Sequence, residues 1–559
     1  MKLNRLLSSL VMVCITLNSH AQYNNMSVPD TLSGTTFNLR ISDTFRQMIS
    51  GNQTVCAGIN NNWWGPTLIL KQGDVVQMNV YNNLQDTTTI HWHGMHLPAI
   101  MDGGPHQTIP PYTFWNPYWK VTNNAGMYWY HPHLHMMAEK QMNEGIGGLI
   151  IVRDSTENSL PLPRTYGVDD IPIVLTDRKF DASNQIVSSS FGDSMVTNGT
   201  LRAQYTMPAQ VVRLRILDAA TERSYNLGFS DNRNFYVIGT DGGLIDTPVA
   251  VNRFLISPGE RVEILVNMNG QSGTNFDLMS YNTALSQNIA GGESFPNGPF
   301  QNALGHTDFR VLHINVGNAT SNAITQIPGT MVNNVYYTAG MAQITRNIAI
   351  GDTQIGQGPL FRINNKIFDI NVIDYNVPLN NCEIWSLNST STFSHPFHIH
   401  DVEFYILSIN GAAPPAYQAG WKDVILVKAQ TIVKFIARFN DYSDSLHPYM
   451  FHCHIALHED EGMMGQFVVG NSPAGIRNVL NNKMKLYPNP GSGKVNFEMA
   501  DNIQIKEAVV LSANGQAVLI VNPNTDRGVL DVSMLSNGIY FIKMQDSEGN
   551  SYLKTYLKE

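Results

Sequence analysis

The chain has 559 residues, of which 43% are hydrophobic and 14% charged, so about three or four domains with sizeable cores can form. The net charge of −9 and the lack of a basic run argue against a nucleic acid as a partner. Asn, Gly, Thr and Pro recur between short apolar runs, a pattern typical of an all-β protein rich in turns.

The N-terminus, residues 1–21, has the features of a secretory signal peptide. Basic residues precede an apolar run at 6–17, and cleavage is expected after Ala21. The run is too short for a membrane span, so we expect an exported protein without a transmembrane segment. Export makes a disulfide between Cys56 and Cys382 chemically permissible, while two free buried thiols fit the sequence at least as well.

After the signal peptide, the sequence pattern predicts three consecutive β-sandwiches. In the first, apolar and polar residues alternate on both sides of a turn at Gly73 and Asp74, and strands are expected again near 127–131 and 146–152. The same pattern continues beyond it. The predicted units are a first sandwich at 22–153, a second at 154–317, a polar linker at 318–345 and a third sandwich at 346–470.

Closely spaced histidines occur in the first and third predicted sandwiches. Successive side chains of a strand point to opposite faces, so the two histidines of a His-x-His pair share one face. Cys453 therefore faces one way while His452 and His454 face the other, and one strand can hold metal on both sides. The pairs are His91 and His93, His131 and His133, His398 and His400, and His452 and His454.

Further metal-binding residues lie close to Cys453 in the sequence. His458 adds an imidazole and Met463 a thioether, which together with the thiolate make up most of a blue-copper electron-transfer site. A second imidazole is available from His395, which stands before a proline. The main alternative is structural zinc, which also takes Cys and His, but its usual Cys-rich clusters are absent from the sequence.

Taken in order, these motifs resemble those of the multicopper oxidases, the family of laccases, bilirubin oxidases and bacterial copper-efflux oxidases. The resemblance implies three consecutive cupredoxin-like Greek-key β-sandwiches and four copper ions. It places a trinuclear site at the interface of the first and third sandwiches, which supply equal numbers of ligands. The implied ligands are His395, Cys453, His458 and Met463 for type 1 copper, His91 and His398 for type 2 copper, and His93, His131, His133, His400, His452 and His454 for the two type 3 ions.

Two carboxylates match positions that the family assigns to proton delivery. Asp102 follows the first histidine motif, and Glu459 is next to the ligand His458. Reduction of dioxygen to water consumes protons, which carboxylates near the metal can relay. The alternatives are that Asp102 caps a glycine-rich turn and that Glu459 is an exposed acid near a helix start.

The resemblance implies an enzyme that couples four one-electron oxidations of a reductant to the four-electron reduction of O2 to water. Copper-efflux oxidases carry a Met-rich insertion, and an Asp and a Met shortly before the third histidine motif. In this chain the segment directly before the third histidine motif is Ser-Thr-Phe-Ser at 391–394, without an Asp or a Met. Between residues 318 and 346, where a Met-rich insertion was sought, the only methionines are Met331 and Met341. This favours phenols or aromatic amines, as in laccases. The alternatives are a cuprous or ferrous metallo-oxidase and a non-enzymatic cupredoxin-repeat scaffold or copper-binding protein.

Residues 154–317 contain no His-x-His pair, and the stretch SPGERVEILV at 257–266 resembles the middle domain of copper-efflux-type oxidases. In that family the middle domain is a spacer without copper. The resemblance therefore assigns the second sandwich no part in metal binding.

Residues 471–559 differ in sequence pattern from the preceding sandwiches, and we expect a linker followed by a small C-terminal β-sandwich. Asn-Gly pairs at 514–515 and 537–538 predict tight hairpin turns. With Tyr-Pro-Asn-Pro at 487–490 and Gly-Ile-Tyr-Phe at 538–541, the segment resembles the C-terminal sorting domain of the type IX secretion system. That implies this machinery as a partner and a secreted or outer-surface location. If the segment is an ordinary binding sandwich, the expected location is the periplasm.

Overall fold

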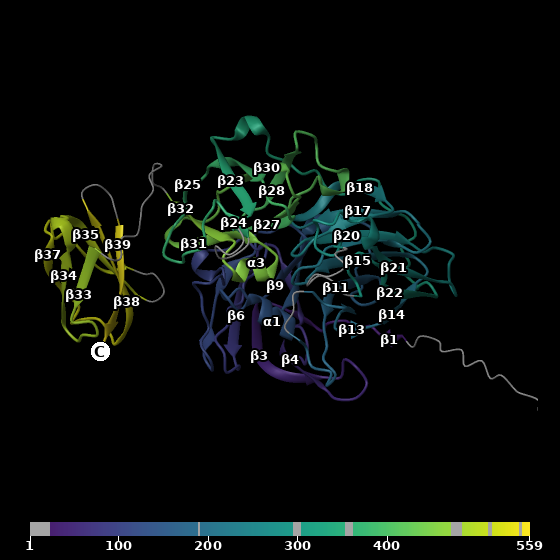
Figure 1. Ribbon diagram of the computed structural model, residues 1–559, viewed down its shortest axis with the longest axis horizontal. Coiled ribbons are helices and arrows are strands. Elements are labelled where there is room, and N and C mark those ends of the chain that lie inside the picture. The colour runs from purple at the N-terminus through teal and green to yellow at the C-terminus, as the bar shows by residue number, and fades with distance from the viewer. Residues whose placement is uncertain are drawn as a thin grey trace, which may run out of the picture.

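The structure is a computed structural model, and it describes residues 23–187, 191–293, 303–352, 361–470, 483–512, 517–546 and 551–559. Strands dominate, arranged as three adjoining sandwiches and a smaller C-terminal one (Figure 1). The predicted all-β class is therefore confirmed. The predicted signal peptide lies outside the described residues. Within the described ranges, no helix has the length and apolar character needed to cross a membrane.

The first sandwich, purple to blue in Figure 1, encloses one apolar core between two sheets. The predicted turn is present, with Gly73 at a φ of +95°. One sheet has β2 (Thr31–Ser33), β5 (Thr67–Lys71), β10 (Gly148–Arg153) and β9 (Gly126–Tyr130) in that order. The other has β4 (Thr54–Ile59), β3 (Thr36–Arg46), β6 (Val75–Asn82) and β7 (Phe114–Trp115), with β8 (Tyr118–Lys120) also paired to β6.

The second sandwich, in teal, is the largest of the three by strand number among the described residues. One sheet runs β1 (Asn24–Asn25), β14 (Ala203–Pro208), β22 (Asp308–Gly317), β21 (Asn275–Tyr281), β16 (Tyr225–Phe229) and β19 (Phe254–Ile256). The other runs β13 (Thr200–Leu201), β12 (Ser194–Thr197), β11 (Asp170–Arg178), β15 (Val211–Asp218), β20 (Arg261–Asn267), β17 (Phe235–Thr240) and β18 (Gly243–Val251). Their facing side chains form a single core.

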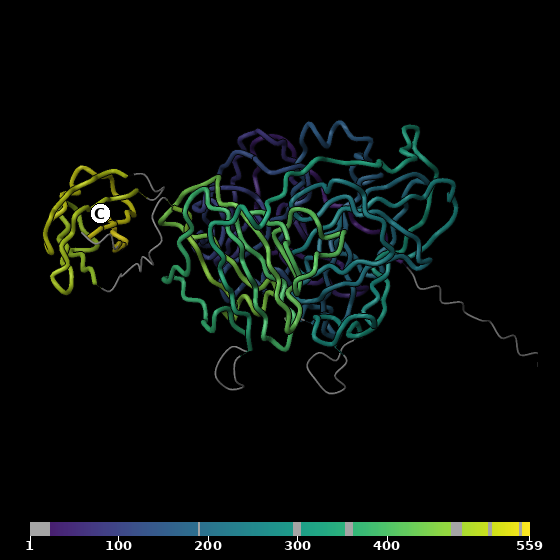
Figure 2. Tube along the Cα trace, turned by 90° about the horizontal axis from the view of Figure 1, so that it is seen from above, coloured from purple at the N-terminus to yellow at the C-terminus, as the bar shows by residue number. Residues whose placement is uncertain are grey.

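The third sandwich, in green, pairs two five-stranded sheets. The sheet that carries two histidine motifs runs β25 (Tyr375–Pro378), β32 (Met464–Gly470), β31 (Asp444–Cys453), β27 (His395–Ile399) and β29 (Val424–Val427). The other runs β24 (Phe361–Ile363), β23 (Ile344–Asp352), β26 (Cys382–Ser389), β30 (Ile432–Arg438) and β28 (Phe404–Ile409). Figure 2 shows this sandwich lying against both of the others.

Two connecting segments are tied to the second sandwich. The strand β1, which precedes the first sandwich in the chain, pairs with β14 in parallel. The predicted linker packs there as well, because Met331 is buried and its N–H donates to the carbonyl of Asp246 at 2.8 Å. The linker is therefore anchored, and β23 already begins at Ile344.

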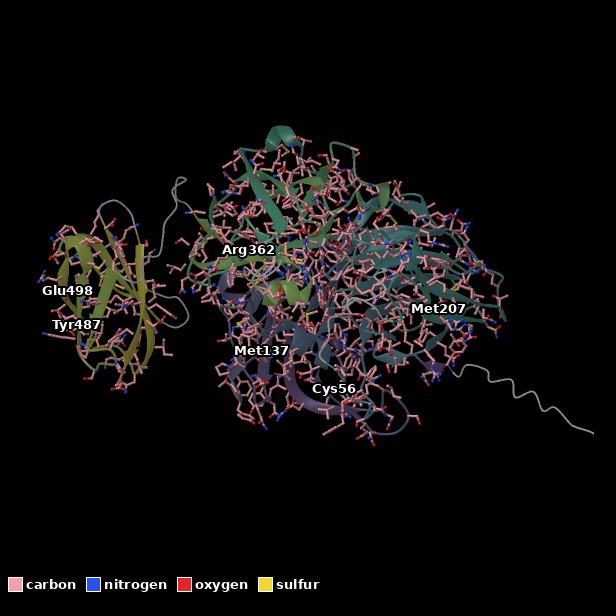
Figure 3. All side chains as sticks on the ribbon, viewed as in Figure 1. Cys56, Met137, Met207, Arg362, Tyr487 and Glu498 are labelled. Atoms are coloured by element: carbon pink, nitrogen blue, oxygen red, sulfur yellow. The ribbon has the colours of Figure 1, made fainter. Side chains whose placement is uncertain are left out.

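The C-terminal sandwich has its own core and forms a separate lobe, in yellow, in which Figure 3 labels Tyr487 and Glu498. One sheet has β33 (Met484–Tyr487), β34 (Lys494–Met499) and β37 (Arg527–Asp531) in that order. The other has β36 (Ala517–Val521), β35 (Ile505–Ser512), β38 (Gly538–Asp546) and β39 (Ser551–Lys558). The Asn-Gly pair at 514–515 lies outside the described residues, although β35 and β36 on either side of it pair antiparallel. The hairpin predicted at 537–538 is wrong, because β37 and β38, which flank it, belong to different sheets.

The three described cysteines, Cys56, Cys382 and Cys453, are buried free thiols. Cys56, labelled in Figure 3, lies in β4 of the first sandwich, whereas Cys382 begins β26 in the third. No disulfide therefore joins these two sandwiches within the described chain.

Two short helices join the first and third sandwiches. The helix α1 (Ala138–Glu144) has no side-chain cap from its own N-terminal residue, Met137. Asp460, the last residue of α3 (Ala456–Asp460), supplies it instead, accepting from the N–H groups of Ala138 at 3.0 Å and Glu139 at 2.9 Å. A carboxylate at a helix N-terminus satisfies free N–H groups and matches the helix dipole. The cap therefore fixes α3, which carries two predicted site residues, against the first sandwich.

We expect Asp460→Ala to lower the apparent melting temperature by about 2–4 °C, because loss of a helix N-cap costs about 1 kcal/mol. Thermal unfolding followed by circular dichroism measures it. Glu461→Ala removes an exposed carboxylate from the same segment and should leave the melting temperature unchanged. Equal values for Asp460→Ala and the wild type would contradict the role of the cap.

Candidate metal centre

Strand pairing in the third sandwich brings its two histidine motifs together. In the antiparallel pair β27 and β31, Phe397 faces Cys453 across the strands and His398 faces His452. Because side chains alternate, Cys453 points into the core of the sandwich, whereas His452 and His454 point toward the first sandwich. The strand β31 and the residue that follows it therefore serve two separate clusters.

The first cluster surrounds the Cys453 thiol. Its Sγ atom lies 3.5 Å from Nδ1 of His395 and 3.5 Å from Nδ1 of His458, and all three side chains are buried. Met463 is buried in the same apolar cluster as Cys453. The Met463 N–H donates to the carbonyl of His458 at 2.8 Å, and its carbonyl accepts from the Cys453 N–H at 3.1 Å. The four residues predicted to bind one metal ion thus lie together.

The two imidazoles share an aromatic environment, and His395 has a polar partner as well. Nε2 of His395 lies 3.0 Å from the Ser391 hydroxyl, which donates to the carboxylate of Asp352. The ring centroid of Phe361 lies 4.5 Å from that of His458 and 4.7 Å from that of His395, and the centroid of Phe393 lies 6.2 Å and 6.0 Å from the same two rings. Both phenylalanines are partly exposed. The outer edge of the cluster is therefore apolar and aromatic.

The second cluster lies between the first and third sandwiches and contains two groups of three histidines. In one group, Nδ1 of His93 lies 3.3 Å from Nε2 of His131 and 3.3 Å from Nε2 of His454. The other group joins the Nε2 atoms of His133, His400 and His452 at 3.2, 3.2 and 3.4 Å. Three nitrogens that each lie about 2.0–2.1 Å from one ion, as imidazoles do in zinc proteins, are about 3.3–3.6 Å apart. Each group therefore has the spacing of a metal site.

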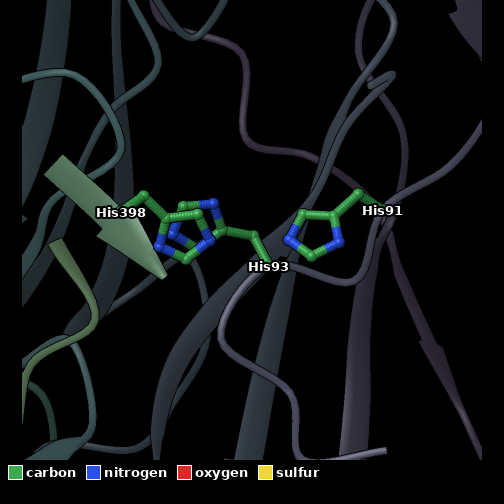
Figure 4. Close-up of side chains that lie close together, drawn as sticks. All are labelled: His91, His93 and His398. Atoms are coloured by element: carbon green, nitrogen blue, oxygen red, sulfur yellow. The ribbon is translucent and has the colours of Figure 1, made fainter. Parts of the chain in front are cut away.

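The remaining predicted pair, His91 and His398, is shown with His93 in Figure 4. Their Nδ1 atoms lie 3.0 Å from the carbonyl of Asp102 and 2.8 Å from that of Asp423. A carbonyl only accepts, so each Nδ1 carries the proton and each Nε2 has a free lone pair. Both Nε2 atoms are buried without a hydrogen-bond partner among the described residues. An unpartnered buried acceptor of this kind is suited to a cation.

Burial keeps these side chains in the form that binds metal. It lowers the pKa of His395 and of His133 to about 3 and that of His452 to about 4, so these imidazoles are neutral at neutral pH. Burial also raises the pKa of the Cys453 thiol, which a metal ion would deprotonate. This donor set, a thiolate with imidazoles and a thioether, fits copper.

The two predicted carboxylates contact the second cluster directly. Asp102 places one oxygen 2.7 Å from Nδ1 of His400 and the other 3.4 Å from Nδ1 of His91. The oxygens of Glu459 lie 3.0 Å from Nδ1 of His133 and 3.4 Å from Nδ1 of His452. Both acids are 1% exposed, and burial raises the pKa of Glu459 to about 7. Neither is therefore an exposed surface acid.

Three residues that contact the clusters or hold them in place were not predicted as site residues. Asp423 reaches His93 and His398, Arg261 binds Asp423, and Ser391 bonds His395. None belongs to a histidine motif. Two stretches had been singled out for other reasons. Ser391 lies in the 391–394 segment that bore on the choice of reductant, and the stretch that contains Arg261 resembles a known middle domain, which pointed to a spacer.

Family models match most of the chain. Models of the multicopper oxidase family match residues 41–157, 181–294 and 333–473, and a secretion system C-terminal sorting domain matches 485–558. Both predicted resemblances are therefore confirmed.

Individual relatives include proteins with different names. Multicopper oxidase mco of Staphylococcus epidermidis is 30% identical over 445 residues, which cover 78% of this chain and 88% of that protein. Cell division protein FtsP of Xenorhabdus nematophila is 30% identical over 439 residues, covering 76% of this chain and 87% of that protein. The structure of CueO, a laccase-like multicopper oxidase from Ochrobactrum sp. with oxidase activity towards lignin model compounds and lignosulfonate, is 32% identical, with a TM-score of 0.70, and covers 79% of this chain and 100% of that chain.

Removal of copper by a chelator should lower the apparent melting temperature, because a ligand that binds only the folded state stabilises it by about 2.7 kcal/mol at 100 times its Kd. Calorimetry of loaded and chelated protein measures this. The double variant His93→Asn, His400→Asn, which removes one histidine from each group of three, should show a much smaller shift. Equal melting temperatures with and without copper in the wild type would contradict metal binding at the interface.

Proposed function

Because the chain belongs to the multicopper oxidase family, we propose that it couples four one-electron oxidations of a small reductant to the reduction of O2 to two waters. The observation that carries this proposal is the complete and buried donor set, in which the histidine groups and the unpartnered pair converge between two sandwiches. A protein that only stores copper or carries one electron needs no such second cluster.

We assign four copper ions to this donor set. The first and third sandwiches supply equal numbers of ligands to the trinuclear site, so loss of either should abolish it. The assignment is type 1 copper at His395, Cys453, His458 and Met463, type 2 copper at His91 and His398, and type 3 copper at His93, His131 and His454 and at His133, His400 and His452.

The chain itself supplies the connection between the clusters. Bound copper would supply one-electron chemistry at the thiolate and reduction of dioxygen at the histidines. Cys453 is bonded through its backbone to both His452 and His454, one in each group of three. The backbone of Cys453 would therefore offer a covalent path of one residue from a copper ion held at its thiolate to either histidine group.

Asp102 and Glu459 are proposed to move protons to the second cluster. Each contacts two of its histidines and is shielded from solvent. A positioned carboxylate can take up a proton and release it to a nearby oxygen atom, and such transfer contributes about 10²–10⁴-fold to a rate.

We propose phenols or aromatic amines as reductants. The rings of Phe361 and Phe393 flank His458, which favours an aromatic donor over a hydrated metal ion. The nearby carboxylate of Asp352 accepts from the hydroxyl of Ser391 and from the N–H and hydroxyl of Thr392, so most of its about four acceptor sites already have a donor. The reported activity of the laccase-like relative on lignin model compounds supports this choice. A cuprous or ferrous metallo-oxidase is the second candidate.

The third candidate is the non-enzymatic cupredoxin-repeat protein expected as an alternative from the sequence, and the likeness to a protein named for cell division, FtsP, is the observation that bears on it. Such a protein has no need for neutral imidazoles aimed at one another in a buried interface. The intact donor set here therefore favours the oxidase.

The C-terminal domain supports a proposal on location. The match to a secretion sorting domain at 485–558 favours export and recognition by the type IX secretion machinery. We propose a secreted or outer-surface enzyme, with residues 1–21 removed as a signal peptide and the tail contributing nothing to catalysis.

Oxygen uptake by the copper-loaded protein tests the reaction and the reductant. We expect uptake with a phenolic donor that Cys453→Ser abolishes, because a serine hydroxyl does not replace the soft thiolate. Cys382→Ser, which changes a buried cysteine outside both clusters, should retain it. Uptake with cuprous ion alone would select the metallo-oxidase, and no uptake with either donor would rule out an oxidase of these classes.

Substitution of the carboxylates should slow the oxygen step and spare the electron step. We expect Glu459→Gln and Asp102→Asn to reduce reoxidation by O2 about 100-fold. Reduction by the donor without oxygen should remain fast, because neither acid belongs to the Cys453 cluster. Stopped-flow absorbance separates the two steps, with exposed Glu461→Gln as the control. Unchanged reoxidation would exclude a proton role for these acids.

A further inference from the structure

The second sandwich contributes no metal donor, yet one of its side chains reaches the histidine interface. Arg261 is the first residue of β20 and is 1% exposed. Its two terminal nitrogens bind the two carboxylate oxygens of Asp423, in the third sandwich, at 2.5 and 2.6 Å. This two-pronged geometry is the strongest and most directional form of ion pair in proteins.

Asp423 in turn holds two histidines of different groups. Its Oδ1 lies 3.2 Å from Nε2 of His93, and its backbone carbonyl accepts from Nδ1 of His398 at 2.8 Å. A carboxylate beside Nε2 favours the tautomer with the proton on that atom, which leaves the lone pair on Nδ1. Nδ1 is the atom of His93 that faces His131 and His454.

The guanidinium has a fixed position because every nitrogen has a further partner. Nε donates to the carbonyl of Met127 in the first sandwich at 3.2 Å, Nη1 to that of Gly259 at 3.1 Å and Nη2 to that of Asp241 at 2.9 Å. Lys422, next to Asp423, binds Asp241 at 2.9 Å. All three sandwiches therefore meet at Arg261.

The turn that precedes Arg261 makes a second contact with the histidines, at the ring of His454. The φ of Gly259 is +87°, and a Cβ added there would lie 2.8 Å from the His454 ring. Only glycine fits this backbone conformation and this distance without displacing the ring. Gly94, which follows His93, meets the same limit, since a Cβ there would lie 2.5 Å from Asp423 and 2.7 Å from Arg261.

We propose that the turn 257–261 of the copper-free second sandwich positions the histidine group of His93, His131 and His454. Arg261 orients His93 through Asp423, and Gly259 leaves the space that the His454 ring occupies. The inference rests on the proposed function, because it assigns positioning residues to one of its metal sites. The second sandwich is then a working part of the interface and more than a spacer.

The test compares Arg261→Met with Arg213→Met in the full copper-loaded chain. Arg213 is buried in the adjacent strand of the same sheet and pairs with Glu157 and Glu263, with no contact to the histidines. Both variants replace a buried, ion-paired guanidinium with the same apolar side chain. After Arg213→Met, Glu157 keeps Arg153 and Glu263 keeps Arg215, so this variant controls for the loss of a buried arginine from the same sheet. Gly259→Ala is the third variant and changes no charge.

Two readings separate positioning from general damage, namely copper bound per chain and the rate of reoxidation by O2 after anaerobic reduction. We expect Arg261→Met and Gly259→Ala to weaken copper retention or slow reoxidation about 10–100-fold, the usual effect of losing a residue that orients a ligand. Reduction of the Cys453 site by the donor should be unchanged in both. Arg213→Met should match the wild type in both readings.

Wild-type copper content and reoxidation in Arg261→Met would overturn the proposal, as would equal losses in Arg213→Met. If Arg261→Met does not fold, Gly259→Ala decides, and a wild-type result there would overturn it. A wild-type protein that holds copper without reacting with O2 would sink the proposed function instead. Copper retention in the variants would then still decide the positioning role.

Discussion

An imidazole directs the lone pair of one nitrogen at a metal site only if a hydrogen bond fixes its other nitrogen. This requirement determines which residues surround the histidines between the first and third sandwiches. The carbonyls of Asp102, Asp423, Pro132 and Cys453 lie within hydrogen-bond distance of Nδ1 of His91, His398, His131 and His452. Carboxylates take the same part at His93 and His400. Since each contact selects one tautomer, the polypeptide fixes where the free nitrogens point before any ion is considered.

Two acidic residues each join histidines of different donor groups. Asp102 contacts histidines of the first and third sandwiches, and so does Asp423. Each therefore links two domains and two donor groups at once. A change in the packing of the sandwiches moves several nitrogens together, which explains why caps such as Asp460 and clamps such as Arg261 lie around this interface.

The parts of this arrangement that depend on local geometry could be predicted from the sequence. The period of two along a strand separates Cys453 from His452 and His454, and motif order identified the family. Arg261, Gly259 and Asp423 could not be found in this way, because tertiary packing alone brings them to the histidines. The same holds for the cap from Asp460 and for the pairing of β1 with the second sandwich. The wrong hairpin at 537–538 has a related cause, since an Asn-Gly pair indicates a turn without showing which strands pair.

The energetics of the interface favour the oxidase over a scaffold. Burying a polar nitrogen without a partner costs about 1–3 kcal/mol, and both His91 and His398 present such an atom. In a scaffold that acts only through its surface, apolar residues of similar volume could replace these two histidines and remove the cost of the unpartnered nitrogens. A bound cation offsets the same cost through its bonds to these nitrogens. The unpartnered nitrogens therefore lower the stability of the metal-free polypeptide and at the same time form a metal-binding site, as is expected where function competes with stability.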